Sequence, residues 1–128
     1  MQIGVIAARA IAFGRRLSNR GTAPSVMQRG EVLEVYPRAT LRRLSDSDGR
    51  LRLREKGESP EGFRGRVLEA LGERVDGLAN EPALLLDGHV FDALVAAYTA
   101  WLAPDGLEQP PEGFNVASGW IWFPREGI

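Results

Sequence analysis

Blocks of hydrophobic and polar residues along the chain predict its elements of secondary structure. Residues 3–17 mix apolar side chains with alanines and arginines, which is typical of an amphipathic helix. Residues 31–36 are rich in β-branched and aromatic side chains and precede Pro37, a pattern that predicts a short strand. Residues 37–44 begin with this proline, which the first turn of a helix tolerates, and predict a short helix.

The second half of the chain predicts two longer helices and a closing strand. The polar residues 45–62 predict a loop with a brief exposed strand at LRLR. Ser59 is the expected N-cap of a helix whose apolar residues, spaced by three and four, continue to Leu78. Residues 89–102 are apolar nearly all round, so we expect a helix that is buried on most sides and capped by Asp87. Residues 119–124 predict the closing strand. Helices between strands favour an α/β fold.

Length and composition fit one globular domain over residues 1–128. The chain is 44% hydrophobic and 26% charged and contains no cysteine. The lack of cysteine excludes a disulfide framework and a cysteine nucleophile, and it favours a cytoplasmic location. No apolar run approaches the length of about 18 residues that a membrane-spanning helix needs, so no membrane partner is expected.

The net charge of −1 conceals an uneven distribution of charge. Residues 1–54 hold eleven arginines and four acids, a net charge of +7, whereas residues 55–128 carry −8. Arginine is suited to phosphate, so the basic half is a candidate nucleic-acid surface, with Arg38, Arg42, Arg43 and Lys56 as the residues expected to contact it. An equally good reading is that the two halves neutralise each other.

Two acids occupy positions that the sequence pattern makes apolar. Glu34 shares a face of the expected strand with Val32 and Tyr36, and Asp92 lies in the most apolar helix. His89 precedes Asp92 by three residues, which places both side chains on one face of that helix. Glu34, His89 and Asp92 could therefore converge on Mg²⁺ or Mn²⁺, with Glu34 and Asp92 as the catalytic carboxylates of a metal-dependent nuclease.

A purely structural reading of the same acids is also open. Asp92 is close enough to the start of its helix to interact with the helix dipole, and Glu34 could pair with Arg38. Other chemistries are excluded or weak, because the sequence has no Walker A loop, no G-x-G-x-x-G motif and no G-x-S-x-G elbow. The three tryptophans lie at apolar positions that are typical of a core.

Four segments together resemble one known family. They are VLEVYPRATLRRL at residues 32–44, Lys56-Gly57, HVFDALVAAYTAWL at residues 89–102 and GWIWFP at residues 119–124. They are similar to the C-terminal part of domain-of-unknown-function family 429, whose members are predicted nucleases of the RNase H-like superfamily. The resemblance covers residues 31–124 and leaves residues 1–30 as an N-terminal helix and loop.

The resemblance implies an RNase H-like α/β fold, with a small mixed sheet flanked by helices. Glu34 matches the glutamate of the central strand and Asp92 the aspartate of the last helix, and the pair His89 and Asp92 resembles last-helix ligands of some Holliday-junction resolvases. No acid precedes Glu31, although the family's first strand carries a metal-bridging aspartate. The resemblance therefore implies a chain that lacks the front of its fold.

We expect from this pattern a metal-dependent phosphodiesterase that is inactive or weakly active alone. One alternative is a module without catalytic activity, which forms a homodimer or docks on another chain through an uncovered sheet edge. Another alternative is nucleic-acid binding without cleavage, through the arginine-rich half of the chain.

Overall fold

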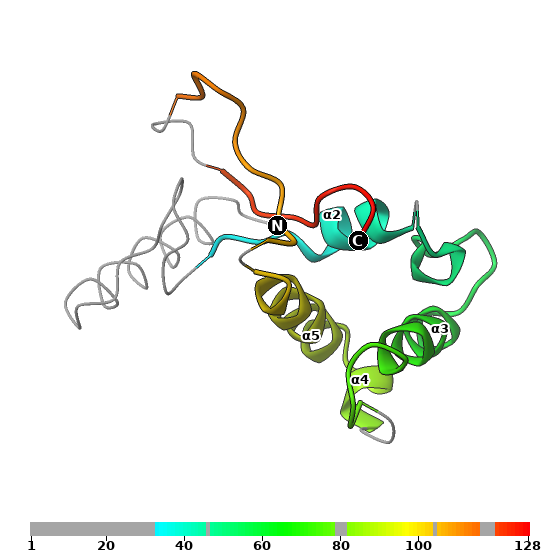
Figure 1. The fold of residues 1–128 in the computed structure, drawn as a ribbon. Coiled ribbons are helices and arrows are strands. Elements are labelled where there is room, and N and C mark those ends of the chain that lie inside the picture. The colour runs from blue at the N-terminus through cyan, green and yellow to red at the C-terminus, as the bar shows by residue number, and fades with distance from the viewer. Residues whose placement is uncertain (1–32, 46, 79–81, 104, 116–119) are drawn as a thin grey trace, which may run out of the picture. The chain divides into compact units, whose positions relative to one another are not determined.

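The computed structural model of the chain describes residues 33–45, 47–78, 82–103, 105–115 and 120–128. The chain divides into two units, one made of Met1–Glu34 with Pro110–Ile121 and the other of Val35–Gln109 with Trp122–Ile128. All the helices of the described residues belong to the second unit (Figure 1). The helix expected over residues 3–17 lies outside the described residues.

The expected α/β fold with a mixed, RNase H-like sheet is wrong for the part of the chain that the structure describes. This part contains four α-helices and one 3₁₀ helix and no β-strand. The two expected strands contribute isolated bridges only, a parallel one between Val35 and Trp122 and an antiparallel one between Leu107 and Pro124. A helix begins directly after Tyr36, and Pro124 has no N–H to donate, so neither pairing extends into a ladder.

Helix α2, Pro37–Leu44, has the bounds that the sequence predicts. Proline at its first turn leaves no amide hydrogen unsatisfied, and Arg42 and Arg43 lie in the last turn, where the helix dipole favours positive charge. The helix buries Thr40, Leu41 and Leu44. It is followed by the 3₁₀ helix η1, Gly49–Leu51, whose last residue is buried, so the exposed LRLR strand predicted there is also wrong.

Helix α3, Pro60–Gly72, begins at the predicted cap. The hydroxyl of Ser59 accepts a hydrogen bond of 3.0 Å from the N–H of Gly62. The helix ends at Gly72, before the predicted Leu78, and the turn that follows contains Gly77 in the left-handed region at φ +84°. The apolar spacing of the sequence therefore continues beyond the helix.

Helix α5, Gly88–Trp101, is capped by Asp87 as predicted. The Asp87 carboxylate accepts hydrogen bonds from the N–H groups of His89 at 2.7 Å and Val90 at 3.3 Å, which lower the pKa of Asp87. Burial on most sides is wrong for this helix, because Val90 and Trp101 are exposed and Trp101 has an exposed fraction of 61%. The short helix α4, Pro82–Leu86, precedes it and was not predicted.

The helices of the second unit pack through one apolar core. Helix α5 packs against α2 and α4, and α3 packs against η1 and α4. The core is formed by nine buried side chains, Leu41, Leu44, Leu51, Val67, Ala70, Leu71, Phe91, Val95 and Tyr98.

A buried polar contact joins α2 to α5. The hydroxyls of Thr40 and Thr99 are 2.7 Å apart, and the Thr99 hydroxyl donates to the Val95 carbonyl oxygen at 2.9 Å. Thr40 is therefore the donor to Thr99. Both side chains are fully buried, so this chain of hydrogen bonds satisfies groups that water does not reach.

The end of the chain returns to the second unit through backbone hydrogen bonds. The N–H of Glu108 donates to the Phe123 carbonyl and the N–H of Arg125 to the Gly106 carbonyl, each at 2.9 Å. Gly106 permits this close packing, because a Cβ atom there would lie 2.5 Å from the Leu102 carbonyl oxygen. Among the described helices, none combines the length and the hydropathy that crossing a membrane requires.

Candidate functional site

The three predicted metal ligands lie on the surface. Glu34 is exposed and precedes α2, and His89 and Asp92 are exposed in the first turns of α5. Glu34 also belongs to a different unit from the other two. Within the described ranges, no group of three or more His, Asp and Glu side chains is placed to hold a metal ion. The exposure of both carboxylates contradicts the expectation that Glu34 and Asp92 lie in apolar surroundings.

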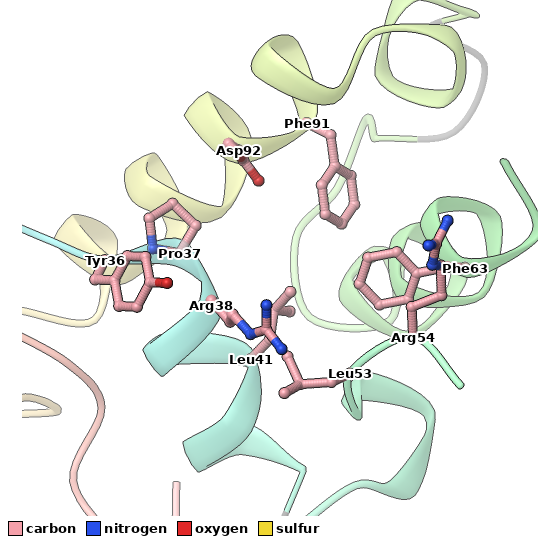
Figure 2. Close-up of a pocket in the computed structure, with 9 residues that line it drawn as sticks. All are labelled: Tyr36, Pro37, Arg38, Leu41, Leu53, Arg54, Phe63, Phe91 and Asp92. Atoms are coloured by element: carbon pink, nitrogen blue, oxygen red, sulfur yellow. The ribbon is translucent and has the colours of Figure 1, made fainter. Parts of the chain in front are cut away.

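One predicted site residue, Asp92, lines a pocket of about 410 Å³. Its walls come from four segments of the second unit, and Figure 2 shows Phe91 and Asp92 projecting from α5 toward the space that Arg38 approaches from α2. The pocket is lined by Tyr36, Pro37, Arg38, Leu41, Leu53, Arg54, Phe63, Phe91 and Asp92. Its volume falls in the range of small-ligand sites, roughly 300–1,000 Å³.

The charged groups of the pocket are two arginines and one aspartate. Arg38, Arg54 and Asp92 are all exposed, and none of them forms a hydrogen bond or an ion pair through its side chain with another described residue. Guanidinium groups present several N–H donors in a planar fork that fits phosphate or carboxylate. The pocket therefore offers unused donors for an anion and one unused carboxylate acceptor.

The aromatic rings of the pocket differ in their accessibility. Phe63 and Phe91 pack edge to face with their centroids 5.6 Å apart, and Phe91 is only 2% exposed. The Arg66 guanidinium carbon lies 5.4 Å from the centroid of Phe63. Tyr36 is 52% exposed, so its ring can stack on a ligand, whereas the buried Phe91 supports the pocket from within.

The other predicted phosphate contacts separate into two kinds. Arg43 is engaged within the protein, because its Nη1 lies 2.7 Å from Oε1 of Glu126 and its guanidinium covers the ring of Phe123. Arg42 and Lys56 are exposed and make no side-chain hydrogen bond or ion pair within the described part of the chain. Arg38 and Arg42 lie four residues apart on α2 and so share one face of it.

Other arginines near α3 are bound to acids. Arg66 donates to both carboxylate oxygens of Glu58 at 2.8 Å, and this pairing lowers the pKa of Glu58 to about 2. Arg50 donates to the carboxylates of Glu73 and Asp48, which raises the pKa of its guanidinium. These side chains serve the fold and are not available to a ligand.

Comparison with known proteins identifies the family. The family model described as "Protein of unknown function (DUF429)" matches residues 4–114. The chain belongs to the DUF429 family. The DUF429 match includes residues 4–30, which the resemblance of the motifs left out, and it ends before the GWIWFP segment at residues 119–124. No curated protein and no solved structure matches the chain significantly.

The DUF429 segment contains pocket residues that sequence reasoning missed. Tyr36 was assigned to a strand, and Arg54 was one cation among many in a polar loop. The available signal was local, because an aromatic residue directly before a helix-starting proline is placed at the rim of whatever that helix packs against. The sequence does not reveal that Glu58, four residues after Arg54, pairs with Arg66 instead.

Proposed function

We propose that this DUF429 protein binds single-stranded nucleic acid at the pocket between α2 and α5. The observation that supports the proposal is that Arg38 and Arg54 line the pocket with no ion-pair partner among the described residues, next to the exposed ring of Tyr36. Arginines bind the phosphates, and the ring accepts an unstacked base.

The arrangement favours a polyanion over a single small anion. Arg42 extends the line of positive charge along the same face of α2, and Lys56 follows Arg54 in the same exposed segment. Several cations that track a chain of phosphates release bound counterions, which makes binding strong at low salt. A single strand fits better than a duplex, because stacking on Tyr36 requires a base that is not already paired.

The proposal does not include cleavage. Mg²⁺ or Mn²⁺ was the expected cofactor, but the described residues do not supply a metal-ligand set, since Glu34, His89 and Asp92 form no cluster. No hydrolytic step is therefore derived from these side chains. Cleavage enters only as a measurement on the oligonucleotide after binding.

The test is fluorescence anisotropy with a labelled 12-nucleotide single strand, as DNA and as RNA, at low salt. The variant Arg38→Ala/Arg54→Ala removes two unpaired cations from the pocket. The matched control Arg43→Ala/Arg52→Ala removes the same charge from two arginines that pair with acids, at 2.7 Å and 2.8 Å. We expect the pocket variant to bind at least roughly tenfold more weakly than the control.

Equal losses in the two variants would show that only net charge matters and would overturn the pocket as the site. An absence of binding by the native protein to both strands would overturn the proposed function. Intact oligonucleotide after incubation with Mg²⁺ or Mn²⁺ is the expected result, and cleavage that Asp92→Ala abolishes would restore the nuclease hypothesis.

A further inference from the structure

The Asp92 carboxylate is the one feature of the pocket that binding to phosphate does not explain. It lines the same pocket as Arg38 and Arg54 without pairing with either of them. A negative charge beside a phosphate site weakens the binding of a polyanion, because the two like charges repel each other. Its position therefore calls for a ligand group that donates hydrogen bonds and lies next to the phosphate.

We infer that the pocket selects a nucleotide whose base is guanine, with Asp92 as the residue that determines specificity. This inference rests on the proposed function. A carboxylate is an acceptor with two oxygens, and it pairs best with two parallel N–H donors. Guanine carries such a pair on its Watson–Crick edge, at N1–H and the 2-amino group.

The other bases fit a carboxylate less well. Thymine and uracil have one N–H donor between two carbonyl oxygens, which the carboxylate repels. Adenine and cytosine carry a single amino group beside an acceptor nitrogen on that edge. Each of them offers one hydrogen bond where guanine offers two, so the difference in affinity is a property of the base edge.

The placement of the pocket residues supports one arrangement of the nucleotide. Tyr36 lies at the start of α2 and is exposed, so the base stacks on its ring. Figure 2 shows the Asp92 carboxylate directed toward the space of the pocket from α5, and the Arg38 guanidinium reaches it from α2. The base edge is then read from one helix and the phosphate is held from the other.

The test varies one base within a constant strand. Oligothymidylate of 12 nucleotides carries a single central guanine, adenine, cytosine or hypoxanthine, and binding is measured by anisotropy. We expect the guanine strand to bind roughly five- to tenfold more tightly than the unsubstituted strand. The hypoxanthine strand, which lacks the 2-amino group, should lose most of this advantage. This arm needs no change to the protein.

The protein variant Asp92→Asn completes the test. It keeps the size of the side chain and removes the paired acceptors, so the preference for guanine should disappear. The control Asp76→Asn makes the same change of charge at an exposed position outside the pocket and should preserve the order of the bases.

The possible outcomes separate the two proposals. Tight binding that is equal for all central bases, or a guanine preference that survives Asp92→Asn, would overturn the inference and leave the proposed function intact. No binding to any of the strands at low salt would overturn both.

Discussion

The second unit of this protein uses arginine in two different ways in two neighbouring regions. Around α3 and η1, Arg50, Arg52 and Arg66 each donate to carboxylates at 2.7–2.8 Å. At the pocket between α2 and α5, Arg38 and Arg54 have no such partner among the residues described. The side chains are the same, but only the first group is used by the fold.

This difference shows why composition alone was ambiguous about function. A chain with many arginines can use them to neutralise its own acids or to bind an external anion. The structure assigns each arginine of the described part to one of these uses by its partners. Arg66 is the clearest structural case, because it also donates to the backbone carbonyls of Arg50 and Arg52.

Reversing the charge of the pocket should have the largest effect on binding. Arg38→Glu/Arg54→Glu replaces two phosphate donors by repelling carboxylates, and we expect the affinity for single strands to fall by more than about 100-fold. Both positions are exposed, so the thermal unfolding midpoint should stay within a few degrees of the native value. A loss of affinity below about threefold would place the site elsewhere.

Removing a paired arginine should have the opposite profile. Arg66→Ala loses both contacts with Glu58 and two contacts with backbone carbonyls, so calorimetry should show a midpoint lowered by about 5–10 °C. Affinity for the oligonucleotide at 20 °C should be unchanged within about twofold. The control Arg52→Ala breaks a more exposed pair and should change both quantities little. A reversed ranking of the two variants would contradict the division into structural and binding arginines.

The contact between α2 and α5, which frames the pocket, depends on a neutral hydrogen bond. Thr99→Val leaves the buried Thr40 hydroxyl without its acceptor and should lower the free energy of unfolding by about 1–3 kcal/mol. The double variant Thr40→Val/Thr99→Val removes both hydroxyls and should recover part of this loss. Urea denaturation measures both values, and a double variant that loses the sum of the two single effects would show that the hydroxyls are not coupled.

The smallest expected effect is on the dependence of stability on pH. Because the pKa of Glu58 is about 2 in the folded protein and near 4.5 when unpaired, its contribution is complete above about pH 4.5 and is lost as the pH falls toward 2. The urea midpoint of the native protein should therefore decrease between pH 6 and pH 3, and Glu58→Gln should make this decrease shallower. Asp48, Glu73 and Asp87 also have lowered pKa values, so some decrease should remain. An identical slope in Glu58→Gln would contradict this assignment.

The sequence predicted helices well wherever a local signal marked the boundary. Pro37 marked the start of α2, Ser59 and Pro60 that of α3, and Asp87 that of α5. These signals act through the nearest backbone N–H groups, so they do not depend on the rest of the fold. The family could also be predicted, since the DUF429 match confirms the resemblance of the motifs.

The strands and the site could not be predicted in the same way. A β-branched run such as that ending at Tyr36 forms a strand only if a partner pairs along its length, and here the pairing is limited to Val35 with Trp122. The position of Asp92 in the pocket depends on the packing of α5 against α2, which local pattern does not contain. Glu34 and Asp92 looked buried because the sheet that would have covered them was assumed.

The most direct test of the central claim is the salt dependence of binding to the single strand. The logarithm of the association constant should fall linearly with the logarithm of salt concentration, and its slope counts the phosphates that the protein neutralises. For Arg38→Ala/Arg54→Ala the magnitude of this slope should be smaller than that of the native protein by about two, whereas Arg43→Ala/Arg52→Ala should leave the slope nearly unchanged. An unchanged slope in the pocket variant, or an equal reduction in the control, would contradict the claim that the unpaired arginines form the binding site.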